Sequence, residues 1–199
     1  MRRARDLVGP ASIVAYLVAV GVIQATGWPD WESLAASADD VAHGQVWLLL
    51  SSGLVIDGLP WLQYTVLVIV LALAYVRVGA ARLWIAGLIA HIGAALLAYA
   101  GLGVLNLIGI GVGDATTDPD YGVSVLLAGE LGVIAVSGGR RTALLVGVLG
   151  VAGFGIGLAD ADALANVEHL LGFLLGAATI LALDRWRPPT RNLARRCVR

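Results

Sequence analysis

Long, unbroken apolar segments constrain this chain more than any other feature of its sequence. Six are visible, each without alternation of polar residues: Pro10–Thr26, Leu59–Val76, Leu83–Leu105, Gly122–Val136, Thr142–Leu158 and Leu164–Leu183. About 20 helical residues, each rising ~1.5 Å, cross a hydrocarbon core ~30 Å thick. A membrane barrel would need strands of alternating polarity, whereas a helix satisfies its own backbone inside lipid. The segments therefore predict an all-α membrane protein with a bundle of six transmembrane helices over residues 10–184.

Composition supports this class and excludes others. Hydrophobic residues make up 59% of the chain, which is far above the share in a soluble domain. The first segment follows three arginines, so a cleaved signal peptide is the alternative, but no small-x-small site follows Ile23. We expect this segment to be retained. The net charge of −1 gives no reason to expect nucleic acid, and the single cysteine, Cys197, can form no internal disulfide.

The charged residues are sorted between alternate connections. All thirteen basic residues are arginines, and they precede the first segment (Arg2, Arg3, Arg5), flank the second connection (Arg77, Arg82), follow the fourth segment (Arg140, Arg141) or follow the sixth (Arg185 to Arg199). The other connections contain acidic residues and no Lys or Arg. The positive-inside rule then predicts a cytoplasmic N-terminus over residues 1–9 and a cytoplasmic Arg-rich tail over 185–199. We expect the multi-pass bundle to lie in the cell (plasma) membrane.

Two external connections differ in length and character. The first, Gly27–Gly58, is long and contains Trp28, Trp31 and Trp47, a residue type that prefers the membrane–water interface. We expect it to be a partly helical, interfacial element in the outer leaflet. The other, Asn106–Tyr121, is rich in Gly and Asp and is typical of a surface loop.

Two polar side chains in the apolar segments have the composition of a nucleophile and its base. In the predicted topology the fourth and sixth segments both run inward from the external face. Ser124 then lies about 5 Å, and His169 roughly 8 Å, below that face. If the helices are neighbours, His169 can take the Ser124 proton, and Ser124 can attack a carbonyl. A serine that only bonds its own helix, and a histidine that only bridges helices, are the structural alternatives.

Glycines near both residues predict close helix packing. Gly122 and Gly129 flank Ser124, and Gly172 and Gly176 follow His169 on one helical face. Free N–H groups near the start of the fourth helix are a possible oxyanion site, to which Gly122 belongs.

These residues resemble motifs of the rhomboid intramembrane serine proteases. Gly122-Val123-Ser124 is similar to the Gly-x-Ser motif of their fourth helix, and the sequence from His169 to Gly176 resembles the His-x-x-Gly-x-x-x-Gly pattern of their sixth helix. Gly44-Gln45-Val46-Trp47-Leu48-Leu49-Leu50-Ser51-Ser52 is similar to a stretch of their first external loop. The resemblance implies Ser124 as nucleophile and His169 as general base, and transmembrane proteins as substrates, with no cofactor.

The chain departs from the family pattern in three places. Val125 replaces the second Gly of Gly-x-Ser-Gly, and Leu48 stands where the loop arginine is expected. The oxyanion-supporting His-x-x-x-Asn of the second helix has no match, although Gln63 or Tyr64 could substitute. The residues therefore leave two interpretations: a divergent protease cutting by a Ser-His dyad, or a pseudoprotease that binds membrane clients without cutting them.

Three further polar residues fall within the apolar segments. His91 and Glu130 are each placed ~12 Å from their own boundary, near the midplane, where we expect them to bond each other or be neutral. Glu168 precedes His169 and is predicted to orient a nearby group or to face external water. A proton pathway through these residues is an alternative function. A metal site would need the three histidines to converge, which the topology does not favour.

Overall fold

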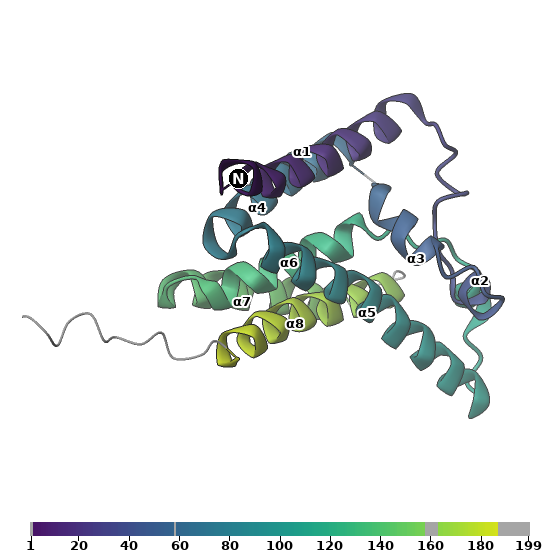
Figure 1. Cartoon of the computed structure of the whole chain (residues 1–199). Coiled ribbons are helices and arrows are strands. Elements are labelled where there is room, and N and C mark those ends of the chain that lie inside the picture. Colours follow the sequence, from purple (N-terminus) through teal and green to yellow (C-terminus); the bar gives the residue numbers. More distant parts are fainter. Residues whose placement is uncertain (1, 58, 158–162, 187–199) are drawn as a thin grey trace, which may run out of the picture.

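The computed structural model describes residues 2–57, 59–157 and 163–186, and within them the chain is helical (Figure 1). The helices are α1 (Arg2–Thr26), α2 (Ala38–Ala42), α3 (Leu48–Ser51), the 3₁₀ turn η1 (Ser52–Leu54), α4 (Pro60–Val78), α5 (Ala80–Leu107), the 3₁₀ turn η2 (Gly113–Thr116), α6 (Val123–Ser137), α7 (Arg140–Gly157) and α8 (Ala163–Arg185). Strand pairing in these residues is limited to one antiparallel bridge, between Ala36 and Asp120. The all-α prediction is confirmed for the described residues. Residues 187–199, with Cys197, lie outside them.

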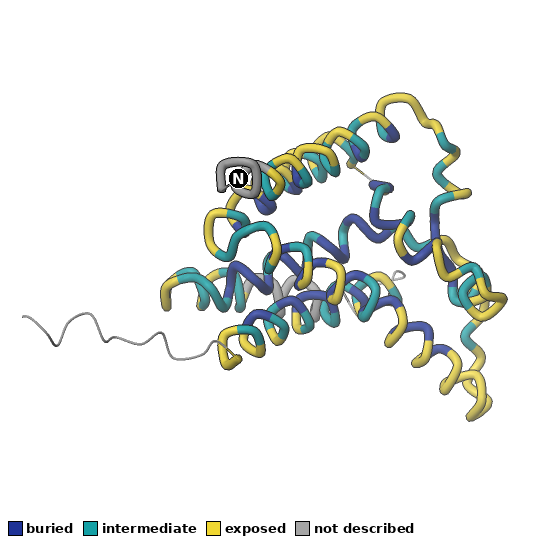
Figure 2. The backbone as a smooth tube through the Cα atoms, in the orientation of Figure 1, coloured by how far each residue is buried: buried dark blue, intermediate teal, exposed yellow. Residues whose placement is uncertain are grey.

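Four helices are long and apolar enough to cross a membrane: Val8–Thr26, Pro60–Val78, Ala80–Leu107 and Leu164–Arg185. The helix Val123–Ser137 is apolar but shorter. Many large hydrophobic side chains on the long helices are exposed to the outside, among them Val76, Ile69 and Leu97 (Figure 2). In water such a surface would be unfavourable, whereas in lipid it meets apolar neighbours.

The turns between helices follow from their sequence. Pro60 occupies the first turn of α4, where its missing N–H and fixed φ are tolerated. Gly79 separates α4 from α5 with φ +79°, a conformation that residues with a Cβ rarely adopt. The two helices can therefore fold back on each other through a single residue.

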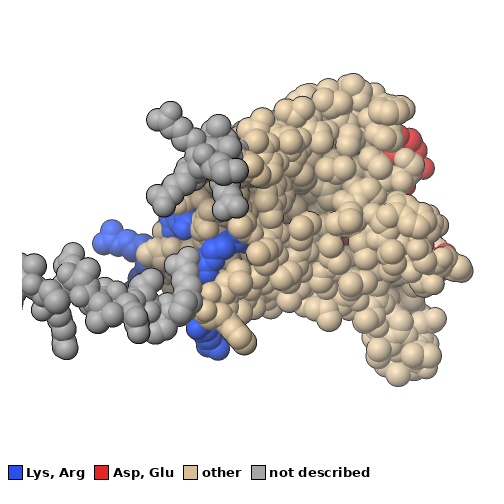
Figure 3. All heavy atoms as spheres, viewed as in Figure 1, with Lys and Arg blue, Asp and Glu red and all other residues tan. Residues whose placement is uncertain are grey.

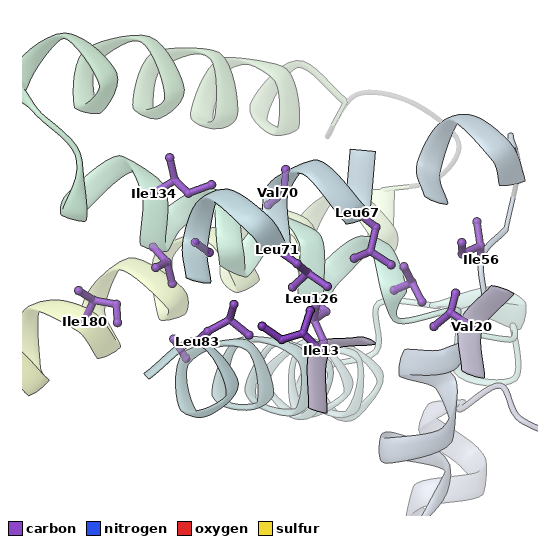
Figure 4. Packing of buried hydrophobic residues seen from close by; sticks show 14 residues of the cluster. Ile13, Val20, Ile56, Leu67, Val70, Leu71, Leu83, Leu126, Ile134 and Ile180 are labelled. Atoms are coloured by element: carbon purple, nitrogen blue, oxygen red, sulfur yellow. The ribbon is translucent and has the colours of Figure 1, made fainter. Parts of the chain in front are cut away.

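Helix α6 is the centre of the bundle. Ten of its fifteen residues are buried, which is expected for a helix that is apolar on all sides. It packs against α4, α5, α7 and α8. Figure 4 shows the main cluster of buried side chains, in which Leu126 and Ile134 of α6 meet Leu67 and Leu71 of α4 and Ile180 of α8. The start of α6 is thereby enclosed by helices that extend beyond it.

The two ends of the molecule carry opposite charge. Figure 3 shows arginines at one end, which we call the basic end, and acidic residues toward the other, the acidic end. At the basic end Arg82 of α5 forms an ion pair with Asp184 of α8, with 2.6 Å between Nη2 and Oδ1. The start of α5 and the end of α8 therefore lie together.

The connection between α1 and α4 contains α2, α3 and η1 and is tied to the rest of the molecule. The Tyr16 hydroxyl of α1 donates to the Gly53 carbonyl at 2.7 Å, and Ser51 Oγ donates to the Leu34 carbonyl at 2.9 Å. Trp28 and Trp47 are exposed. The placement of this connection in the membrane interface stays a prediction.

Candidate functional site

The glycines of α6 and α8 bring these helices into backbone contact. A Cβ on Gly172 would lie 3.0 Å from the Val125 carbonyl oxygen, and a Cβ on Gly176 would lie 2.1 Å from the Gly129 carbonyl oxygen. Both contacts advance by one turn in the same direction, so α6 and α8 run parallel. We call this contact the α6–α8 seam, defined by Val125, Gly129, Gly172 and Gly176. At Gly176 a hydrogen atom is the only side chain that permits so close an approach, and at Gly172 a Cβ would be tightly packed.

Ser124 lies in the first turn of α6. Gly122 is the residue that caps this helix, and Ser124 Oγ donates to the Tyr121 carbonyl at 3.4 Å. Ser124 is half-buried, so its hydroxyl is not sealed in the core. The first N–H groups of a helix have no partner within the helix, and Ser124 belongs to the turn that carries them.

His169 lies on α8, one turn before Gly172, and residues three apart share a helical face. Gly172 contacts Val125, which directly follows Ser124. The seam therefore places the Ser124 turn of α6 and the His169 turn of α8 at one level. His169, like Ser124, is half-buried.

A second serine and histidine meet where η1, α5 and α6 join, and sequence reasoning did not pair them. Ser52 Oγ lies 3.4 Å from His91 Nε2, and the Gly122 N–H donates to the Ser52 carbonyl at 3.0 Å. A Cβ on Gly122 would lie 1.8 Å from His91 Cε1. We call Ser52, His91 and Gly122 the Ser52–His91 junction. Ser52 is 0% and His91 2% exposed, so neither is accessible.

The predicted hydrogen bond between His91 and Glu130 is wrong for a geometric reason. Glu130 lies against Gly87, one turn before His91, where a Cβ would be 2.7 Å from Glu130 Oε1. The His91 ring instead faces Gly122 at the start of α6, about two turns from Glu130. Neither carboxyl oxygen of Glu130 has a hydrogen-bond partner in the described structure, although the residue is 0% exposed. A carboxyl group in such surroundings is expected to be neutral.

Glu168 belongs to a polar cluster and does not face water, since only 1% of it is exposed. Its carboxyl group is hydrogen-bonded to that of Asp120, and the Tyr99 hydroxyl donates to Asp120 Oδ2 at 3.2 Å. Burial raises the pKa of Asp120 above its ordinary value, although the hydrogen bonds from Tyr99 and Glu168 act in the opposite direction. Among the described residues, no three of His, Cys, Asp and Glu gather to form a metal site.

The two candidate oxyanion supports on α4 contact other groups. The Gln63 side-chain amide donates to the Asp57 carbonyl. The Tyr64 hydroxyl donates to the Leu17 carbonyl of α1 at 3.0 Å, and its ring packs on Gly21. Their role in oxyanion support stays a prediction, and in this arrangement each side chain would have to leave its partner to serve it.

Comparison with known proteins matches the chain to one family. A family model described as rhomboid-like protein matches residues 33–188, which include the first long connection, the α6–α8 seam and both candidate catalytic residues. No curated protein and no solved structure matches the chain.

Proposed function

The chain belongs to the family of rhomboid-like proteins, and from this membership we propose that it is an intramembrane serine endopeptidase. Its substrates would be transmembrane segments of other membrane proteins. Ser124 is the nucleophile and His169 the general base. The alternative, a rhomboid-like pseudoprotease, keeps the same fold and binds the same class of client without cutting it.

The observation that carries the proposal is the register of the α6–α8 seam. Val125 contacts Gly172, Ser124 directly precedes Val125, and His169 lies three residues before Gly172, so the first turn of α6 and the His169 turn of α8 are adjacent along the seam. Both residues are half-buried, so a peptide bond can approach them. Ser52 and His91 are sealed, which favours a structural role for that pair.

The proposed reaction follows from these two side chains. His169 accepts the Ser124 proton while Oγ attacks the scissile carbonyl carbon. The tetrahedral oxyanion is stabilised by N–H groups of the first turn of α6 that follow Gly122. The N–H of Gly122 itself donates to the Ser52 carbonyl. The imidazolium then protonates the leaving amine, and a water molecule releases the acyl group by the same route.

The proposed topology has six spans, with α6 and α7 completing the four long apolar helices. Arginines mark the basic end as cytoplasmic by the positive-inside rule, so the acidic end faces outward. Ser124 and His169 then lie on the outward half of the bundle, in a cell membrane, where water can enter from outside.

Two observations favour the pseudoprotease as the second candidate. Val125 fills the position of the second Gly of Gly-x-Ser-Gly and is buried in the seam. Gln63 and Tyr64 are bonded to the Asp57 and Leu17 carbonyls, which leaves α4 without an evident oxyanion donor.

A fluorophosphonate probe tests the proposal because it reacts only with an activated serine. Purified protein should be labelled, and Ser124→Ala and His169→Ala should each abolish labelling while the circular dichroism and elution volume stay unchanged. Folded wild-type protein that takes no label but captures transmembrane peptides would establish the pseudoprotease instead.

A further inference from the structure

We propose that Asp120 and Glu168 share one proton, and that this carboxyl bridge is a positioning device for the Ser124–His169 dyad. The inference rests on the proposed function, because it assigns the bridge to that dyad. Glu168 directly precedes His169 on α8, and Asp120 lies in the loop that leads into α6, four residues before Ser124. The bridge therefore joins the two chain segments that supply the dyad.

A proton between the two carboxyl groups is required by their chemistry. An ionised carboxylate can only accept hydrogen bonds. A hydrogen bond between two carboxyl groups therefore requires that one of them is protonated and donates. Asp120 and Glu168 are hydrogen-bonded neighbours, Glu168 is 1% exposed, and its buried Oε1 has no donor from another group of the described residues. If both ionised, the like charges of a buried and a half-buried carboxyl group would repel each other with little water to screen them.

Among the described residues around the bridge, none supplies a positive charge that would compensate two carboxylates, although the hydrogen bond from Tyr99 favours the ionised form of Asp120. From α5, the Tyr99 hydroxyl donates to Asp120 Oδ2 at 3.2 Å and supplies no positive charge. From α2, Asp40 acts on Tyr99 at longer range, and it is held by Ser37 Oγ at 2.6 Å and Gln45 Nε2 at 3.1 Å. On α8 itself His169 is the neighbouring titratable group. The described residues thus place no arginine at the bridge.

The backbone of Asp120 extends the connection to the first long loop. Its N–H donates to the Ala36 carbonyl at 2.6 Å, and the Ala36 N–H donates to the Asp120 carbonyl at 3.2 Å. The described chain between Asp120 and Ser124 is short, so a shift of Asp120 is transmitted to the start of α6. Loss of the bond between Asp120 and Glu168 removes this link between the loop and the His169 turn of α8. The contact between Gly172 and Val125, one turn further along α8, does not depend on that bond.

The predicted consequence is an activity that requires the bridging proton. Labelling by a fluorophosphonate should rise with pH while His169 becomes neutral, and then fall on the alkaline side as the bridge loses its proton. For a single proton the alkaline fall approaches about tenfold per pH unit.

The test compares the pH profile of labelling in wild type, Glu168→Gln and Asp120→Asn. Each amide can donate to the remaining carboxylate and has no proton to lose, so the alkaline fall should disappear in both variants. Glu168→Ala, which removes the bond, should label slowly at every pH. Asp118→Asn, an exposed carboxyl of the same loop, is the matched control and should keep the wild-type profile.

An alkaline fall that persists unchanged in Glu168→Gln and Asp120→Asn would overturn the proposal, as would a wild-type profile without one. If Glu168→Gln does not fold, Asp120→Asn makes the same change from the loop side. If wild type takes no label at any pH, the proposed function fails while the bridge remains testable by thermal unfolding. The midpoint of wild type should then decline over the alkaline range and that of the amide variants should not; parallel midpoints would overturn the bridge.

Discussion

Two regions of the molecule each contain a serine and a histidine, and the two regions differ in what surrounds these residues. At the α6–α8 seam, Ser124 and His169 are half-buried on parallel helices. At the Ser52–His91 junction, the two side chains lie 3.4 Å apart but are 0% and 2% exposed. At the junction the serine and histidine side chains contact each other. Only at the seam are the two residues partly exposed, as a residue that contacts a substrate must be. Composition alone would not separate a catalytic pair from a structural one.

The difference also shows how one region supports the other. Gly122 belongs to the junction through its N–H and through its contact with His91, and it caps the helix whose first turn holds Ser124. The buried pair therefore fixes the position where the accessible pair begins. We interpret the junction as a structural clamp on the start of α6.

Cleavage of a transmembrane reporter would separate the two regions by the largest effect. Ser124→Ala should lower the cleavage rate by about 10⁴-fold or more, since removal of a serine nucleophile leaves only binding and oxyanion terms. Ser52→Ala should change the rate by less than about tenfold, because its hydroxyl acts on position and not on the reacting bond. Rates in proteoliposomes with a fluorescent reporter measure both.

The reverse result would assign the chemistry to the junction. If Ser52→Ala were inactive and Ser124→Ala active, with both folded, the interpretation of exposure would be wrong. Mass spectrometry of the labelled peptide gives an independent answer, because the peptides that contain Ser52 and Ser124 differ in sequence.

The helices could be predicted from sequence because lipid leaves few alternatives. The predicted segments Pro10–Thr26 and Leu83–Leu105 fall within α1 and α5, and each observed helix extends beyond them. The additional residues include polar ones, such as Asn106 in α5, which a hydropathy criterion excludes from a membrane-spanning segment. Backbone hydrogen bonding continues the helix where hydrophobicity has ended.

The site could be predicted only in part, because motif spacing carries no information on tertiary neighbours. Gly-x-Ser and His-x-x-Gly indicated Ser124 and His169, but nothing in the sequence joined Ser52 to His91. The packing of η1 against α5 decides that contact, and the register of α5 against α6 separates His91 from Glu130. Of the two roles predicted for Glu168, facing external water is wrong, because the residue is 1% exposed; its neighbour Asp120 lies in a loop far away in sequence.

Disruption of the α6–α8 seam by Gly176→Ala should have the next largest effect, on both stability and activity. In Gly176→Ala the new Cβ would lie 2.1 Å from the Gly129 carbonyl oxygen, a backbone atom that cannot rotate away. The helices must separate, and we expect a loss of about 3 kcal/mol in the free energy of unfolding, with activity lost as well. Unfolding in a denaturing detergent mixture measures the change.

Gly101→Ala is the matched control for the seam. Gly101 lies on α5 with nothing within 4 Å of an added Cβ. Alanine there should leave activity unchanged and stabilise the helix by about 0.5–1 kcal/mol. Equal losses in both variants would show that helix propensity, and not the seam contact, controls the outcome.

Gly122→Ala tests whether the junction controls the start of α6. The backbone of Gly122, with φ −79°, accepts alanine without strain, so only the contact with His91 opposes it. The Cβ would lie 1.8 Å from His91 Cε1, and we expect a destabilisation of about 1–3 kcal/mol. Adding His91→Ala removes the ring and should recover part of both stability and labelling. A double variant no better than Gly122→Ala would contradict the clamp.

Ser52→Ala should produce the smallest effect and is the most specific test of the clamp. The substitution leaves the Ser52 carbonyl, and hence its bond from the Gly122 N–H, in place. It removes only the 3.4 Å contact with His91 Nε2, which is long for a hydrogen bond, so the expected loss is about 1 kcal/mol. In His91→Ala the loss caused by Ser52→Ala should vanish, because the partner is already gone. Equal losses in both backgrounds would mean that Ser52 acts through its other neighbours, and the clamp would then consist of His91 and Gly122 alone.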